Sequence, residues 1–182
     1  MNNNKGFTLI EMMVVIAIMT VLATLVLPDF LGLTQKSRLR KAARDVYSSM
    51  QTARMGAIQS GFGWDVRFRK NQDDVLIFNP GPDGIMGGDG KKDDVKTFIE
   101  LADYKNVKYG LGNFGPIPDG SKPGDGISFG SNRVTFQSDG TANKAGTVYL
   151  TTDSGEEAYA ISVLFTTGRI KFWKNSGAGW EG

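Results

Sequence analysis

The sequence predicts an α+β protein, in which a long N-terminal helix is followed by an antiparallel β-sheet or sandwich. Two observations favour this fold class. The run from Phe7 to Leu27 contains 21 residues and a single charge. After Gly61, short segments of alternating or apolar residues are separated by turn residues, which is typical of antiparallel strands. We expect the C-terminal half of the helix to pack on the β domain.

The apolar run is long enough to cross a bilayer. About 20 apolar residues, each rising about 1.5 Å along a helix, cover the hydrocarbon core of a membrane. The charge in the run is Glu11. A carboxylate near the middle of a lipid-facing helix costs about 2.5–3.5 kcal/mol, so it should have a partner. The sequence therefore predicts a transmembrane and assembly helix over 7–28, and proteolysis after Gly6 would create a nearby amine at Phe7.

The start of this run matches a processing signal. Lys5-Gly6-Phe7-Thr8-Leu9-Ile10-Glu11 combines a short basic leader, a Gly-Phe junction and a glutamate that opens an apolar stretch. It resembles the prepilin leader and cleavage site of type IV pilins and of the pseudopilins of type II secretion. The resemblance implies that residues 1–6 are a leader and that prepilin peptidase cuts between Gly6 and Phe7 and methylates the Phe7 amine. It also implies that Glu11 neutralises the amino terminus of a neighbouring subunit in a helical filament.

Three simpler interpretations compete with this one. A secretory signal peptide would be removed whole, but no Ala-x-Ala site closes the run and Glu11 lies inside it. A plain membrane anchor explains the length but neither the Gly6-Phe7 junction nor Glu11. A buried core helix fits poorly because the run is apolar on all faces.

Composition excludes several classes of site. The chain has no cysteine and no histidine. Disulfide frameworks, Ser-His-Asp and Cys-His nucleophilic sites and imidazole metal ligands are therefore excluded. No set of residues supports an enzyme. The net charge of +2 is uneven, because residues 1–60 hold seven Lys/Arg and three Asp/Glu, whereas residues 61–182 hold fourteen and sixteen.

Residues 29–61 predict an amphipathic helix that continues the first one. Apolar residues recur at spacings of three and four, on one narrow face suited to packing against a sheet: Leu39, Ala43, Val46, Met50, Ala53 and Ala57. Gly61 and Gly63 should end the helix. The basic run 36–44 could contact anionic lipid head groups, nucleic acid or acidic neighbours, or be a solvated helix face.

Charge counting conflicts with the orientation that the leader implies. The positive-inside rule places Lys5 in the cytoplasm, but the five cations of 36–44 outnumber it and favour the reverse. The resemblance decides the conflict. It implies a single-pass inner-membrane protein with a cytoplasmic N-terminus, a periplasmic globular domain over 62–182, and incorporation into a pseudopilus or pilus.

The region 62–182 predicts a β-rich domain. Candidate strands lie at 64–69, 75–78, 95–101, 107–111, 127–129, 133–137, 147–151, 159–165 and 169–173. Asp139-Gly140 and Thr167-Gly168 give the clearest turn signals. The stretch 79–126 holds eleven of the 24 glycines and five of the six prolines, and so predicts long loops around one or two short strands.

Three segments of this half carry a second resemblance. Residues 134–142, 146–150 and 167–171 resemble the C-terminal domain shared by H-type minor pseudopilins and FimT-like minor pilins. The resemblance implies a pilin fold. The stretch 79–126 departs from the family pattern and has no counterpart to guide its interpretation.

An acidic, glycine-rich segment is the best candidate for a metal site. Asp83, Asp89, Asp93 and Asp94 could supply hard oxygen ligands to calcium. Their spacing does not match an EF-hand loop, and the adjacent Lys91 and Lys92 oppose cation binding. The alternative is a solvated turn and no cofactor.

A basic strand is the candidate for nucleic-acid contact. On a strand, Arg169 and Lys171 point to one face, about 7 Å apart, and can meet neighbouring phosphates. Lys174 adds charge nearby, and Trp173 could lie against a base. In the FimT-like branch a Gly-Arg-x-Arg/Lys element near this place is linked to DNA capture. The alternative is an edge strand protected from pairing by its charges.

Together, residues and resemblance imply a minor pseudopilin with a structural role in the pseudopilus of type II protein secretion. The alternative is a FimT-like minor type IV pilin involved in pilus assembly or DNA uptake. The implied partners are other pilins or pseudopilins in a helical filament, prepilin peptidase and an inner-membrane assembly platform, with DNA as a partner in the alternative.

Overall fold

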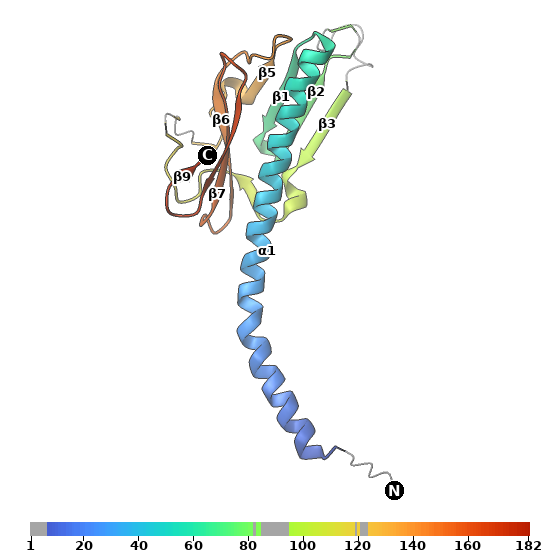
Figure 1. Ribbon diagram of the computed structural model, residues 1–182, viewed down its shortest axis with the longest axis vertical. Coiled ribbons are helices and arrows are strands. Elements are labelled where there is room, and N and C mark those ends of the chain that lie inside the picture. The colour runs from blue at the N-terminus through green and yellow to red at the C-terminus, as the bar shows by residue number, and fades with distance from the viewer. Residues whose placement is uncertain (1–6, 82, 85–94, 119, 121–123) are drawn as a thin grey trace. The chain divides into compact units, whose positions relative to one another are not determined.

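The computed structural model describes residues 7–81, 83–84, 95–118, 120 and 124–182, although the side chains of residues 23–33, 95 and 96 lie outside that description. The chain divides into two compact units, Met1–Gln35 and Lys36–Gly182. Helix α1, Leu9–Ser60, is followed by strands that form two antiparallel sheets (Figure 1). The predicted α+β class is confirmed.

The C-terminal end of α1 lies where the sequence predicts it. Gly61 adopts a left-handed conformation with φ of 75°, and its N–H donates to the carbonyl oxygen of Ala57 at 3.1 Å. Glycine is favoured just past a helix end because it has no Cβ to oppose positive φ.

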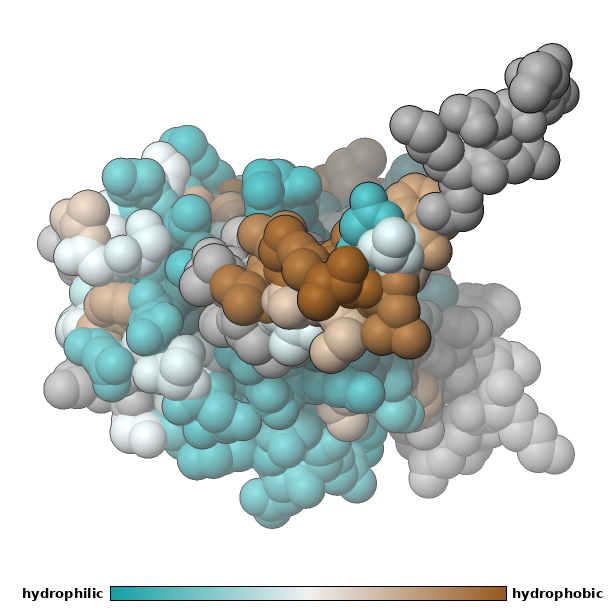
Figure 2. All heavy atoms as spheres, turned by 90° about the horizontal axis from the view of Figure 1, so that it is seen from below, coloured by the Kyte–Doolittle hydropathy of each residue, from teal (hydrophilic) through white to brown (hydrophobic). Residues whose placement is uncertain are grey.

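The described large apolar side chains of the first unit are exposed. Seen from below, hydrophobic residues gather in one group (Figure 2). Exposed large apolar residues of this unit are Phe7, Leu9, Ile10, Met12, Met13, Val14, Val15, Ile16, Ile18, Met19, Val21 and Leu22. Among the residues whose side chains are described, no helix is both long and apolar enough to cross a membrane. The predicted span over 7–28 includes side chains outside that set and stays a prediction.

The second unit holds both sheets (Figure 1). The first sheet has the order β3-β2-β1-β5, and the second has the order β4-β6-β7-β8-β9. The first comprises β1 Trp64–Arg69, β2 Asp74–Asn79, β3 Val95–Glu100 and β5 Arg133–Phe136. The second comprises β4 Val107–Tyr109, β6 Gly146–Thr152, β7 Ala158–Val163, β8 Ile170–Asn175 and β9 Trp180–Glu181.

One apolar core joins α1 to both sheets. The six residues of the predicted helix stripe, from Leu39 to Ala57, are fully buried, together with Ala42. They share a cluster with Val66 and Phe68 of the first sheet and with Leu150 and Ile161 of the second. The alternation of inward and outward residues on the strands therefore points apolar side chains of both sheets at the helix. The predicted packing is confirmed.

Two details differ from the sequence prediction. Residues 127–129 form only an isolated bridge, between Ile127 and Val148, because a 3-10 turn begins at Gly130 and ends the pairing. The short strand β9 was not predicted, since its two residues give no periodic signal. Trp180 of β9 belongs to a smaller cluster on the far face of the second sheet, with Leu111, Ile117, Tyr149, Ala160 and Trp173.

Candidate functional site

Thr8 and Glu11 form a reciprocal cap at the start of α1. The N–H and the hydroxyl of Thr8 donate to Oε2 of Glu11 at 2.9 and 3.0 Å, and the N–H of Glu11 donates to the Thr8 hydroxyl oxygen at 3.3 Å. This is a capping box, in which a Thr before the helix and a Glu three residues later satisfy backbone N–H groups that have no helical partner.

The cap defines what surrounds the predicted assembly residue. Glu11 is exposed, and among the described residues the hydrogen-bond partner of its carboxylate is Thr8. Phe7 is also exposed, at 77% of its surface. Gly6 lies outside the described residues, so the structure leaves the processing junction untested.

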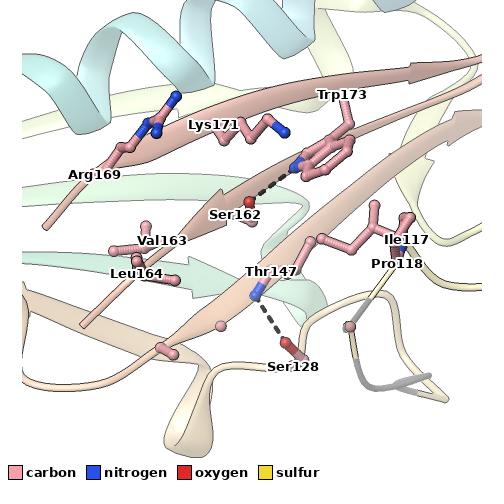
Figure 3. A pocket seen from close by; sticks show the side chains of 13 residues that line it. Ile117, Pro118, Ser128, Thr147, Ser162, Val163, Leu164, Arg169, Lys171 and Trp173 are labelled. Carbon is pink, nitrogen blue, oxygen red and sulfur yellow. Dashed lines mark hydrogen bonds between the residues drawn. The ribbon is translucent and has the colours of Figure 1, made fainter. Parts of the chain in front are cut away.

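Arg169 and Lys171 line the same pocket, as the strand period predicts. The pocket has a volume of about 550 Å³ and lies on the face of β8 that points away from α1. The Lys171 ammonium lies over the Trp173 ring, 3.7 Å from its centroid. Trp173 in turn donates from Nε1 to the Ser162 hydroxyl at 2.9 Å, as Figure 3 shows. Trp173 therefore stacks with a cation of its own strand.

The turn before β8 holds Arg169 in place. Arg54 of α1 donates to the carbonyl oxygens of Gly140 and Thr167, both at 2.9 Å. Gly168 has φ of 59°, and a Cβ there would overlap the Gly140 carbonyl oxygen, so only glycine fits. The Arg169 carbonyl oxygen accepts from the Leu164 N–H at 3.0 Å. The exposed guanidinium of Arg169 thus extends from a fixed backbone.

Lys174 does not join the other two cations. It forms an ion pair with Glu157, with 3.4 Å between Lys174 Nζ and Glu157 Oε1, and it does not line the pocket. Its odd spacing from Arg169 and Lys171 places it on the opposite face of β8. The sequence grouped the three cations by proximity alone, and the strand period separates them.

The calcium candidates are not brought together within the described residues. Asp83 is exposed, whereas Asp89, Asp93 and Asp94 lie outside the described part of the chain. Across the residues that could be searched, no group of three or more acidic residues could hold a metal ion. The calcium site stays a prediction.

Two parts of the chain match known families. Residues 1–27 match the prokaryotic N-terminal methylation motif, and residues 42–167 match the family described as type II transport protein GspH. The chain belongs to the GspH family. The GspH match includes the C-terminal part of α1 and extends to the turn that precedes β8.

Individual relatives of this GspH-family chain resemble shorter parts of it. A fimbrial protein of Pseudomonas aeruginosa is 39% identical over 61 residues, which is 34% of this chain and 39% of that protein. Type II secretion system core protein G of Pectobacterium carotovorum is 50% identical over 44 residues, which is 24% and 28%. The chain thus spans less than half the length of these curated relatives.

A solved structure shares the fold. The minor pseudopilin EpsH from the type 2 secretion system of Vibrio cholerae superposes with a TM-score of 0.50 at 14% identity, over 74% of this chain and 95% of that chain. At that identity the likeness shows the fold alone, and it agrees with the pilin fold that the sequence predicts.

Sequence reasoning missed several residues of these sites. Thr8 had a readable signal, because a Thr three residues before a Glu at the start of an apolar run is a capping-box motif. Arg54 and Ser162 had none, since their partners lie 86 and 11 residues away and are brought close only by the fold.

Proposed function

We propose that this GspH-family chain is a minor pseudopilin, a structural subunit of a type II secretion pseudopilus, and that it works by assembly and not by catalysis. The proposal rests on the surface of the first unit. Among its described side chains, the large apolar ones are exposed and the one acidic residue is Glu11. Such a surface needs lipid or other apolar helices around it.

The proposed route begins in the inner membrane. The anchor lies in the bilayer with its N-terminus in the cytoplasm and the β domain in the periplasm. Prepilin peptidase cuts between Gly6 and Phe7 and methylates the new amine. The assembly platform then transfers the subunit into a helical filament of pilins or pseudopilins.

Glu11 is the proposed assembly contact. In a dry bundle of helices, a Phe7 ammonium without a partner would cost several kcal/mol of desolvation free energy. A neighbour's Glu11 carboxylate offsets that cost and sets the axial register of the two helices. The Thr8 cap supports this role, because it satisfies the carboxylate before assembly and leaves one of its oxygens, Oε1, without a described partner.

A second function rests on the basic pocket. Arg169 and Lys171 line the same pocket, where both could contact phosphates, and a fimbrial protein is among the relatives. A FimT-like minor pilin of pilus assembly or DNA uptake would use them to bind DNA.

Deletion of the gene for this chain in its own host cells distinguishes the two functions. For a pseudopilin, deletion should reduce the secretion of extracellular proteins and leave surface pili and DNA uptake unchanged. Loss of pili or of DNA uptake with normal secretion would favour the second function.

Processing gives an independent test in the same cells. The mature protein should begin at Phe7 and be about 14 mass units heavier than the bare sequence, because one methyl group is added. Intact-mass spectrometry that finds Met1 retained, in cells with active prepilin peptidase, would contradict the assignment of the junction.

A further inference from the structure

The pocket beside β8 is formed by hydrogen-bond donors and apolar side chains. The Arg169 guanidinium and the Lys171 ammonium can only donate. Neither forms an ion pair with a described residue, and none of the described lining residues is acidic. The pocket therefore carries positive charge that the described chain leaves unneutralised.

Two serine hydroxyls of the pocket are also free to donate. Ser128 accepts from the Thr147 N–H at 2.7 Å, and Ser162 accepts from the Trp173 Nε1–H at 2.9 Å (Figure 3). Neither hydroxyl donates to a described residue. Because each oxygen already accepts a hydrogen bond, its own proton is available to a ligand.

Part of the pocket wall is apolar. Ile117 and Pro118 come from the loop before β5, and Leu164 comes from the turn before β8. Leu164 is 56% exposed, so its side chain is open to contact with a ligand. The ligand should therefore present both acceptor atoms and apolar groups.

We propose that this pocket binds an acidic segment of a partner protein, with carboxylates at Arg169 and Lys171 and an apolar side chain against Ile117 and Leu164. A carboxylate only accepts hydrogen bonds, and so fits a pocket of donors. A concave site of about 550 Å³ holds a few side chains, whereas a DNA duplex is much wider and carries its phosphates along its outer surface. The proposal stands on the pocket alone. It is compatible with the pseudopilin function and competes with DNA binding by Arg169 and Lys171.

The test uses the purified full chain in a mild nonionic detergent. The probe is a short fluorescein-labelled peptide of alternating Glu and Leu, compared with the same peptide carrying Gln in place of Glu. Fluorescence anisotropy at about 50 mM salt, where ionic contacts are least screened, should show binding of the Glu peptide only. Equal binding of the two peptides would overturn the proposal.

Matched variants locate the binding. Arg169→Gln with Lys171→Gln should weaken binding of the Glu peptide by at least about tenfold, since two charge-assisted contacts are lost. Lys70→Gln with Lys105→Gln removes the same charge from two other exposed lysines and should leave affinity unchanged. An equal loss in both pairs would mean nonspecific attraction and would contradict the proposal.

Two further experiments test whether the variants lose binding by misfolding and whether the pocket binds nucleic acid. Arg169→Lys with Lys171→Arg keeps both charges and should retain most of the binding, whereas a loss as large as that of the Gln pair would contradict a role for the charges. A short DNA duplex should not displace the Glu peptide at an equal concentration of negative charges. Displacement by DNA would assign the pocket to phosphates and overturn the peptide proposal, without affecting the assembly role of Glu11.

Discussion

Arg54 on α1 donates from Nε to the carbonyl oxygen of Gly140, which lies 86 residues later in the chain, at 2.9 Å. The same guanidinium donates to the carbonyl oxygen of Thr167 at 2.9 Å. One side chain thereby joins the helix to the β5–β6 turn and to the turn before β8. The second turn carries Arg169, so the helix also helps to fix the pocket.

The first prediction is that Arg54→Ala destabilises the chain by about 2–4 kcal/mol, since two hydrogen bonds from a charged donor are lost. Arg38→Ala is the control, because Arg38 is an exposed cation on the same helix. Thermal unfolding in mild detergent, followed by near-ultraviolet circular dichroism, measures both. Equal melting temperatures for the two variants would show that the Arg54 contacts add nothing to stability.

The second prediction concerns Gly168. Gly168→Ala should destabilise by more than about 2 kcal/mol, because alanine opposes positive φ and its Cβ would overlap the Gly140 carbonyl oxygen. Gly61→Ala is a matched control, since Gly61 has a similar φ of 75° and no atom lies within 4 Å of the place that an added Cβ would take. It isolates the cost of the backbone conformation. We expect a clearly smaller loss of melting temperature for Gly61→Ala, and the reverse order would refute the overlap.

The third prediction is that deletion of residues 1–34 leaves a soluble, folded, monomeric β-rich domain. The helix stripe from Leu39 to Ala57 and both sheets lie within the unit Lys36–Gly182, so the core stays complete. Circular dichroism and gel filtration of the shortened chain test this. A spectrum of unfolded chain would show that the core needs the removed segment.

The fourth prediction is a loss of stability at alkaline pH. Burial, together with the Glu157 charge and hydrogen bond, raises the pKa of Tyr159 from about 10 to about 12. The folded state therefore binds the phenol proton more tightly than the unfolded state. The protonated Tyr159 contributes fully to the free energy of unfolding below pH 10, and this contribution is lost as the pH rises toward 12. Tyr159→Phe should reduce the fall in unfolding free energy between pH 8 and pH 11 by about 1.4 kcal/mol. Urea unfolding at the two pH values measures it, and an unchanged fall would contradict the assignment.

The sequence predicted the elements whose pattern is local. The stripe from Leu39 to Ala57 has a helical period, and the burial of its six residues follows from that period. Arg169 and Lys171 share a face because strands have a period of two. Contacts across the chain carry no such signal, which is why Arg54, Ser128 and Ser162 were not predicted. Lys174 was wrongly grouped with Arg169 and Lys171, because residues that are close in sequence were assumed to lie on one face of the strand.

Glu11 is the proposed assembly contact through its charge, and Glu11→Gln tests this role more directly than Glu11→Ala. Glutamine at this position can still accept from Thr8 in the capping box, so it removes the charge and keeps the helix start. Thr8→Val is the matched control, because it removes the side-chain half of the cap and keeps the Glu11 carboxylate.

The measurement compares, for each variant, the processed protein in the membrane fraction with the protein in sheared or cross-linked filaments. All variants should be inserted and cleaved. Glu11→Gln and Glu11→Ala should enter filaments poorly, Glu11→Asp should lose less, and Thr8→Val should enter nearly as well as the natural chain. If Glu11→Gln enters filaments as well as the natural chain while Thr8→Val does not, Glu11 serves the cap of its own helix and the assembly contact is contradicted.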